Sequence, residues 1–426
     1  VDVFYQREDV WEFATERYRE SFQAVEPYYV MLNFPDEEDI EFVLIIPFTL
    51  AATYIISHPR RKAIRIDGGL KILLALLAFG ALSFLWARWP RAVIVWLIMT
   101  SFYIGVYFIV VLFTVHRHHL YHWNYTFLAM SFVLLVMTTL EWVLFGRLTQ
   151  FSAMDIDEVT YVGVYGRWVM LAIPFTFHSA LWGRNKLEKT VGIAGIVACL
   201  LTIALTTRRA PVLALPLVLG AYVIVLRRGA RELLAIAGIA ALVLLLLVLH
   251  NPAYAGRFTQ MVTMIGEVVT SGRDMTHARL AKLLGGIEAT IRYPILGLGA
   301  GNFRIWSKDV FGWHIRFNPH NLTLYLTANL GIVGLSIFVG FLAYAWRRMR
   351  RAIDIFRDGG DLYMASFAAA VFAGFIGMLF YSQIQPFFHS INLYMMAALG
   401  SATYAVAREQ QQSTQDAQPD EVAETG

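Results

Sequence analysis

The stretch AVIVWLIMTSFYIGVYFIVVLFTV, residues 92–115, contains no charged side chain and is long enough to cross a membrane as a helix. The hydrocarbon core of a bilayer is about 30 Å thick, which about 20 apolar helical residues can span. Comparable stretches recur along nearly the whole chain, in which 58% of the 426 residues are hydrophobic and 15% are charged. Because backbone groups in lipid must bond to one another, these stretches are expected to be helices, and the sequence predicts an all-α polytopic membrane protein.

The hydropathy pattern predicts eleven membrane-spanning helices. We expect them near residues 40–57, 70–87, 92–115, 124–146, 161–183, 190–207, 210–226, 232–250, 322–346, 361–383 and 391–407. Four basic runs, HPRRKAIR, RNKLEK, RRGARE and RRMRR, fall on alternate loops. The positive-inside rule therefore places these loops in the cytoplasm, and the largest intervening loop, residues 251–321, lies outside.

This topology divides the chain into five segments. Residues 1–39 carry eleven Asp or Glu against three Arg and are expected outside the membrane. They precede a transmembrane part at residues 40–250, the external loop domain at 251–321 and the C-terminal transmembrane part at 322–407. Residues 408–426 contain almost no bulky apolar side chain, so composition predicts a disordered cytoplasmic tail.

Charge and cysteine content exclude two classes of function. The net charge of +4 is carried by basic residues at cytoplasmic helix ends, so topology explains it and no nucleic-acid partner is expected. The lone cysteine, Cys199, falls in a predicted span, which excludes a disulfide framework and a thiolate metal cluster.

The external loop contains a predicted amphipathic helix followed by a glycine-rich turn. Apolar positions over residues 279–291 follow a helical period, which is typical of a helix lying beside the membrane. Tyr293-Pro294 ends this helix, because proline disfavours helical angles in the residue before it. The glycines of GLGAG, residues 297–301, follow a helix rather than a strand, so they predict close backbone packing and not a dinucleotide site.

A histidine stands at the mouth of the next predicted span. His320 and Asn321 are followed after nine residues by Gly331 and, after two more, by Gly334. This pattern resembles the signature of bacterial O-antigen ligases and O-antigen polymerases, and it is the most specific match to that family.

Further segments between residues 80 and 340 resemble the same family. YPILGLGAGNF, residues 293–303, is similar to its proline-glycine segment, and Arg279 stands where the loop arginine of the family usually does. LTTRRAPVLALPLVLG is similar to a helix start with the sequence Ser-Arg, with Thr207 in place of the serine and Arg208 as the arginine. LSFLWARWPRA, residues 82–92, is similar to the early Ser-x-x-Trp-x-x-x-Pro segment.

The resemblance implies a fold and a location. Family members have about twelve membrane helices, a large helical periplasmic loop and the glycosyltransferase class C type of architecture in the bacterial inner membrane, with the active site facing the periplasm. Twelve helices would require one span before Val1, or one of the eleven spans to be drawn differently.

The resemblance also implies a reaction. Family members transfer a glycan from an undecaprenyl-diphosphate donor to a hydroxyl acceptor, without a metal or another cofactor. The shared motif concerns the donor and the base, and lipid A-core is the acceptor that we favour, as in a ligase. A growing glycan, as in an O-antigen or exopolysaccharide polymerase, and a protein hydroxyl stay open as alternatives.

The family pattern assigns roles to side chains of this sequence. Neutral His320 is the expected general base, because an imidazole can accept the acceptor proton near neutral pH. Arg208 and Arg279 are expected to bind the donor diphosphate, since guanidinium groups form paired hydrogen bonds with phosphate oxygens. Arg209 competes with Arg208 in register, and Arg273 in the tripeptide Ser-Gly-Arg competes with Arg279.

Supporting roles are expected for four more residues. Asn321 is predicted to cap the helix that follows it. Gly331 and Gly334 complete the signature, and Arg167 near an external helix end is a candidate contact for donor phosphate or sugar. Aromatic rings near this end, including Trp306 and Tyr325, are candidates for stacking on sugar rings.

Other readings compete with this one. Asp155 and Asp157 form a pair that could bind a divalent cation, although a solvated loop explains them as well. The histidines of residues 116–122 superficially suggest a metal site but fall on the cytoplasmic side, where interfacial placement is expected. A transporter for an anion or polysaccharide would be expected to show internal repeats or paired broken helices, and the sequence contains neither signal.

Overall fold

The computed structural model describes residues 67–145, 161–206, 209–226, 238, 276–311, 318–319, 321–384 and 390–416. Its elements are α5 (Gly68–Leu82), η1 (Ser83–Leu85), α6 (Pro90–Phe113), α7 (Arg117–Phe145), α8 (Tyr161–Trp182), α9 (Lys186–Thr206), α10 (Arg209–Leu226), α13 (Thr276–Arg292), α14 (Phe303–Phe311), α15 (Leu322–Asp358), α16 (Leu362–Ile384) and α17 (Ile391–Asp416). All of them are helical, which confirms the all-α prediction for the described residues.

Six of these segments are long and apolar enough to cross a membrane. They are Gly68–Leu85, Pro90–Phe113, Arg117–Leu140, Lys186–Leu205, Leu322–Asp358 and Leu362–Ile384. Residues Ala210–Leu226 form a shorter apolar helix, and the expected spans in α8 and α17 are also helical. The chain is therefore a polytopic membrane protein. The expected spans at 40–57 and, apart from Gly238, at 232–250 lie outside the described residues.

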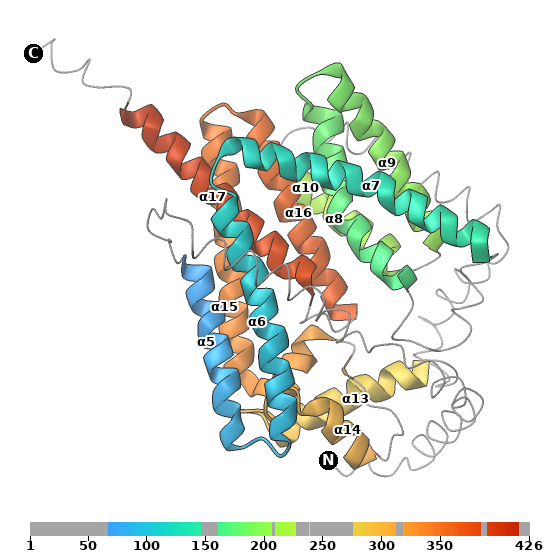
Figure 1. Cartoon of the computed structure of the whole chain (residues 1–426), viewed down its shortest axis with the longest axis vertical. Coiled ribbons are helices and arrows are strands. Elements are labelled where there is room, and N and C mark those ends of the chain that lie inside the picture. The colour runs from blue at the N-terminus through green and yellow to red at the C-terminus, as the bar shows by residue number, and fades with distance from the viewer. Residues whose placement is uncertain are drawn as a thin grey trace, which may run out of the picture.

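The helices pack side by side around α16 (Figure 1). One group contains α5, α6 and α15, and another contains α8, α9 and α10. The central helix α16 contacts α8, α10, α15 and α17. At one end of the bundle lie α13, α14 and the turn between α5 and α6 (Figure 1). The positive-inside rule predicts that this end faces outward, and we call it the external end.

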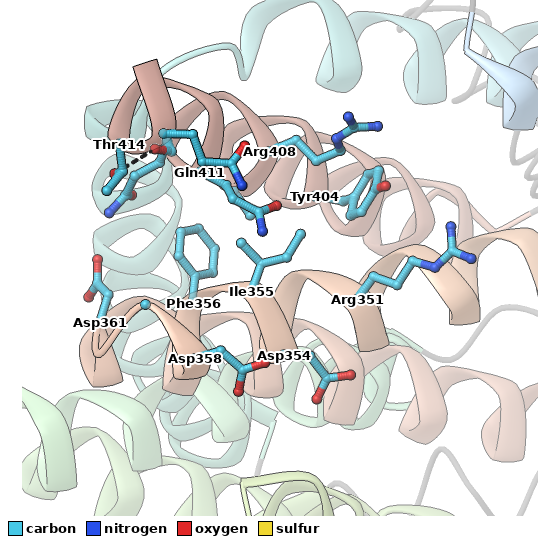
Figure 2. Close-up of a pocket in the computed structure, with 14 residues that line it drawn as sticks. Arg351, Asp354, Ile355, Phe356, Asp358, Asp361, Tyr404, Arg408, Gln411 and Thr414 are labelled. Atoms are coloured by element: carbon cyan, nitrogen blue, oxygen red, sulfur yellow. Dashed lines mark hydrogen bonds between the residues drawn. The ribbon is translucent and has the colours of Figure 1, made fainter. Parts of the chain in front are cut away.

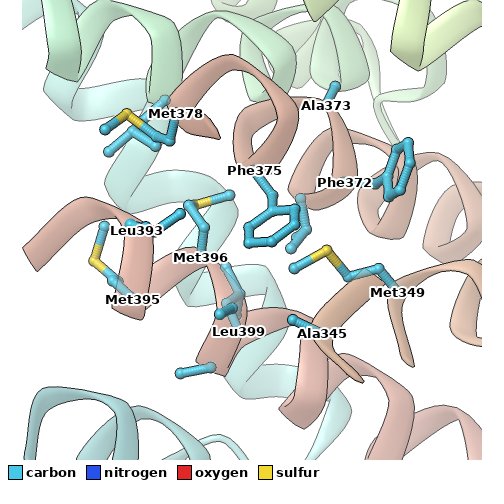
Figure 3. Close-up of a cluster of buried hydrophobic side chains, with 14 of the residues drawn as sticks. Ala345, Met349, Phe372, Ala373, Phe375, Met378, Leu393, Met395, Met396 and Leu399 are labelled. Carbon is cyan, nitrogen blue, oxygen red and sulfur yellow. The ribbon is translucent and has the colours of Figure 1, made fainter. Parts of the chain in front are cut away.

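Small residues allow the helices around α16 to approach closely. Its run Ala368–Ala370 and Gly374 are buried, and a Cβ at Gly374 would lie 2.9 Å from the methyl carbon of Met396 in α17. Figure 3 shows the methionines of this layer, including Met349 of α15 and Met396, gathered around Phe375. Flexible thioether side chains fill the irregular space between closely spaced helices.

Large apolar side chains also cover the outside of the bundle. Val133 is 57% exposed, Ile193 57% and Ile224 72%, on α7, α9 and α10 respectively. Such exposure would be unfavourable in water, but lipid tails solvate these side chains as well as a protein core does. The pattern agrees with a bundle surrounded by a bilayer.

Two helices continue beyond the ends that hydropathy predicts. Helix α15 reaches Asp358, twelve residues past the expected end of its span, because Met349, Ile353 and Phe356 keep one face buried. Helix α17 continues to Asp416, whereas composition predicts a disordered tail from Arg408. The segment REQQQ consists of good helix formers, so a helix that is already formed and packed propagates through it.

A buried carboxylate joins three helices at the opposite end, which we call the cytoplasmic end because the positive-inside rule predicts that it faces the cytoplasm. Glu188 of α9 is 5% exposed. It accepts hydrogen bonds from Tyr363 of α16 at 2.7 Å and Asn124 of α7 at 3.3 Å. The backbone N–H and Nε of Arg184 also donate to it, at 3.0 and 3.3 Å. These four donors compensate for the desolvation of the charge.

Candidate active site

Helix α15 is broken at Gly331, where φ is 64° and ψ is −168°. The break leaves backbone groups without partners inside the helix, and the segment after α13 supplies them. Leu298 N–H donates to the carbonyl of Ala328 at 2.9 Å, and Ile332 N–H donates to the carbonyl of Pro294 at 2.9 Å. A Cβ at position 331 would collide with the carbonyl of Ile295, so both the dihedral angles and the space require glycine.

The glycine-rich segment fits against this break without side chains. Gly297, Gly299 and Gly301 have φ values of 70°, 100° and 70°. A Cβ at Gly297 would lie 2.5 Å from the backbone of Asn329, and one at Gly299 would lie 2.6 Å from the Cβ of Ala87. The predicted close backbone packing is therefore confirmed, and the segment lies between α15 and the turn before α6.

Two buried asparagines fix this arrangement. The side-chain oxygen of Asn329 accepts from Phe303 N–H at 3.0 Å, and its amide donates to the carbonyl of Tyr325 at 2.8 Å. The side-chain oxygen of Asn302 accepts from Trp89 N–H at 2.9 Å. Neither asparagine was expected to matter from the sequence. The sequence signal that could have found them is an uncharged amide side chain, which stands inside an apolar stretch for Asn329 and directly before a helix for Asn302.

The early serine of the family-like pattern is part of the same unit. Ser83 Oγ accepts from Ala300 N–H at 3.0 Å and donates to the carbonyl of Gly80 at 2.6 Å. Residues 82–92, 293–303 and 328–333 are far apart in the sequence but meet here. Three of the segments that resemble the O-antigen ligase pattern thus form one hydrogen-bonded unit.

Asn321 caps α15, as the sequence predicts. Its side-chain oxygen accepts from Leu324 N–H at 2.9 Å, and its amide donates to the carbonyl of Gln383 at 3.2 Å. Thr323 Oγ1 donates to the side-chain oxygen of Gln383 at 3.0 Å. These contacts tie the start of α15 to the end of α16. His320 itself lies outside the described residues, between buried Pro319 and this cap.

Helix α13 packs against the start of α15 through a polar face. A Cβ at Gly286 would lie 3.1 Å from Pro319, and Thr290 Oγ1 lies 2.8 Å from Thr327 Oγ1. Lys282, four residues before Gly286 on the same face, is 2% exposed. Helical spacing puts position 279 one turn before Lys282. Lys282 was not predicted as a site residue, although its spacing of three residues from Arg279 puts both positions on one helix face.

The starts of α8 and α10 approach this end from the other side. A Cβ at Gly166 would lie 2.6 Å from the side chain of Pro211 and 3.3 Å from the hydroxyl oxygen of Tyr381. Arg167 is half-buried beside this contact, and Arg209 is the first residue of α10. Tyr381 lies two residues before Gln383, which holds Asn321. The end of α16 therefore connects the arginine-bearing helix starts to the start of α15.

Only some of the candidate residues are among those that the structure describes. Arg208, Arg273 and His320 lie outside them, and for Arg209 and Arg279 only the helical backbone is described. Gly334 lies within α15 and is buried. Trp306 and Tyr325 were expected to offer rings to sugars, but they are 3% and 6% exposed and pack inside the protein, so that expectation is wrong for these two.

The alternative metal sites receive no support from the described part of the chain. Asp155 and Asp157 lie outside it. The histidine rings of residues 116–122 contact one another, and those of His118 and His119 are tilted by 58° with their centroids 4.0 Å apart. Within the described residues, no three His, Cys, Asp or Glu side chains are arranged to hold a metal ion.

The N-terminal segment is similar to a different group of proteins. Residues 1–58 match the family model described as "Uncharacterised protein family (UPF0182)". Over 47 residues the chain is 49% identical to a UPF0182 protein of Trichodesmium erythraeum (strain IMS101) and 53% identical to one of Methanospirillum hungatei JF-1. Each match covers 11% of this chain and 5% of the relative, so the chain spans about a twentieth of the length of these relatives.

A second family model matches the part of the chain that contains most of the candidate active site. Residues 194–339 match the family model described as "O-Antigen ligase". This range contains the starts of α10 and α15, all of α13 and the break at Gly331. The match confirms the resemblance that the motifs indicate: residues 194–339 carry the domain of the O-antigen ligase family.

Proposed function

We propose that this protein is a metal-independent glycosyltransferase that moves a glycan from undecaprenyl diphosphate to a hydroxyl acceptor at the periplasmic face of the inner membrane. The acceptor that we favour is lipid A-core, as in an O-antigen ligase. The observation that carries the proposal is the meeting of α13, the starts of α8, α10 and α15, and the end of α16 at one end of the bundle. These elements contain Arg167, Arg209, Arg279, Gly331 and Gly334, and in the sequence Arg208 directly precedes α10 and the His320-Asn321 pair directly precedes α15.

In the proposed reaction, the acceptor oxygen attacks the anomeric carbon of the donor sugar. The bond from that carbon to the diphosphate oxygen breaks, and the lipid diphosphate leaves with the electron pair. His320 takes the acceptor proton. Positioned cations stabilise the charge that develops on the leaving group.

The packing of α13 favours Arg279 over Arg273 as one of these cations. Position 279 belongs to the helix whose polar face meets Pro319 and Thr327 beside the His-Asn pair, whereas position 273 precedes that helix. Lys282, one turn after position 279 on the same helix, is 2% exposed and is a further candidate cation. Arg208 or Arg209 would approach from the start of α10.

The break in α15 bears on the transporter alternative. Interrupted helices line the substrate paths of many transporters. Here the backbone groups on both sides of Gly331 bond to residues 294–299, so this break forms a rigid support and does not leave open backbone groups along a path. The enzyme is the better explanation of the geometry.

The test is transfer by the purified protein in nanodiscs with undecaprenyl-diphosphate oligosaccharide and EDTA. Lipid A-core, free glycan and a serine-containing peptide are offered separately. We expect transfer to lipid A-core. Transfer to glycan or peptide alone would replace the ligase by a polymerase or a protein glycosyltransferase, and activity that requires added Mg²⁺ or Mn²⁺ would contradict the metal-independent mechanism.

A further inference from the structure

A cavity of about 630 Å³ lies between the cytoplasmic ends of α15 and α17, far from the candidate active site. The part of α15 after the break at Gly331, residues 332–358, has 27 residues and is therefore about 40 Å long, whereas the hydrocarbon core is about 30 Å thick. Its last turns must lie beyond the hydrocarbon, at the level of lipid headgroups and the cytoplasm. The cavity opens at this level.

Two arginines lie at one end of the cavity. Figure 2 shows Arg351 on α15 and Arg408 on α17 at the end where Tyr404 lies, whereas Asp361 and Thr414 lie at the other end. Both helices run towards the cytoplasm, so the end with the arginines is nearer to the membrane. Trp346, about one turn before Arg351, is 43% exposed, as expected for an aromatic anchor at the headgroup level.

The acidic side chains near the cavity lie beside other arginines. Asp354 and Asp358 share one guanidinium, that of Arg357, at 2.6 and 3.5 Å. Asp361 pairs with Arg117 of α7 at 2.7 Å. Figure 2 shows Asp354 and Asp358 on the side of α15 that faces away from α17, and Asp361 at the end of the cavity opposite Arg351 and Arg408.

Arg351 and Arg408 differ from the neighbouring Arg348 in whether other side chains hold the guanidinium group. Arg348 stacks over the rings of Tyr344 and Tyr404, at 4.9 and 4.4 Å from their centroids. Arg351 and Arg408 are exposed and form no ion pair or ring contact within the described ranges. Two permanently charged groups from facing helices are therefore available to one anion at the membrane surface.

We propose that this cavity binds the phosphate of an acidic phospholipid headgroup, with Arg351 and Arg408 as its cationic partners. Guanidinium groups bind phosphate oxygens through paired hydrogen bonds, and anionic lipids attract basic residues at the cytoplasmic surface. Tyr404, which is 8% exposed, and the apolar side chains of Ile355 and Phe356 form the wall against which the headgroup lies. This site is independent of the transferase reaction.

The experiment measures lipid binding to the full chain in detergent by native mass spectrometry, with phosphatidylglycerol and with neutral phosphatidylcholine. We expect phosphatidylglycerol to bind the wild-type protein more tightly. Substituting both Arg351→Gln and Arg408→Gln should weaken this binding by about tenfold or more, since each basic residue contributes to the attraction. The single Arg408→Gln variant should show an intermediate loss.

A matched control carries Arg347→Gln and Arg350→Gln. These two residues belong to the same basic run but do not line the cavity, and their substitution removes the same amount of charge. We expect their effect to stay below about twofold, because the distance from the bound phosphate and screening reduce it. An equal loss in both double variants would overturn the proposal, because the basic run would then act as a diffuse surface charge.

Competition with soluble glycerol 3-phosphate tests whether the site binds the phosphate of a lipid or that of a soluble compound. We expect it to compete only weakly, because it lacks the acyl chains that hold the lipid at this level. Competition at the affinity of phosphatidylglycerol would contradict a lipid site and indicate a soluble phosphate ligand. Unchanged melting temperatures in neutral detergent verify that the variants fold.

Discussion

The N–H of Gly299 donates a hydrogen bond to the carbonyl oxygen of Asn329 over 2.9 Å. This bond crosses from the glycine-rich segment to α15, two residues before the break at Gly331. It belongs to the set of backbone contacts that fixes the external half of α15, which Asn321 caps. The helix that directly follows the candidate catalytic residue thus depends on a backbone structure that contains no catalytic group.

Substituting Gly331→Ala should disrupt this structure. The residue has φ of 64°, and a Cβ would collide with the carbonyl of Ile295. Backbone angles in this region, which is essentially restricted to glycine, cost another residue about 1–3 kcal/mol, and the collision adds to that. We expect a lower melting temperature and a loss of transfer. Gly340→Ala is the control, because nothing lies within 4 Å of its Cβ position; an equal loss in the control would contradict the explanation.

Substituting Asn329→Ala should destabilise the same unit from inside. The side chain is 1% exposed and bonds to the backbone of Phe303 and Tyr325. Leaving a buried N–H without its acceptor costs about 1–3 kcal/mol. Thermal unfolding in detergent measures this. Thr139→Ala removes an exposed hydroxyl that bonds only within its own helix, and should leave the transition unchanged.

Substituting Asn321→Ala should weaken both the cap of α15 and its link to α16. Loss of an N-cap side chain costs about 1 kcal/mol. Asn321→Asp keeps the cap oxygen but loses the donor to the carbonyl of Gln383, so it should recover the stability of the cap more than the rate of transfer. Equal recovery of both quantities would mean that the link to α16 does not position the neighbouring histidine.

Substituting Glu188→Ala should destabilise the protein at the cytoplasmic end. The change leaves Tyr363, Asn124 and Arg184 without their shared acceptor, at an expected cost of about 2–4 kcal/mol. Transfer per folded molecule should stay unchanged, because this cluster lies at the opposite end from the candidate site. Glu409→Ala, at an exposed position of α17, serves as the control for removing one negative charge.

The sequence predicts the helices well because lipid requires long apolar stretches, and the glycines 297–301 and the cap at Asn321 follow from local backbone rules. The break at Gly331 could not be predicted, since its stability comes from residues 294–299, which approach only in the folded chain. The roles of Asn302 and Asn329 were missed for the same reason. Helix ends were misjudged at Arg408, where packing and propagation outweigh composition.

The proposal that His320 is the general base is tested most directly in the His320→Ala variant. Donor binding and transfer are compared in this variant. Donor binding is measured with fluorescent undecaprenyl-diphosphate oligosaccharide in nanodiscs, and transfer is measured in the same preparation. His118→Ala, at the cytoplasmic end, is the control. We expect His320→Ala to bind donor within about threefold of wild type and to lose transfer by about 10²-fold or more, as for removal of a general base. Transfer at the wild-type rate in this variant would show that His320 is not the general base.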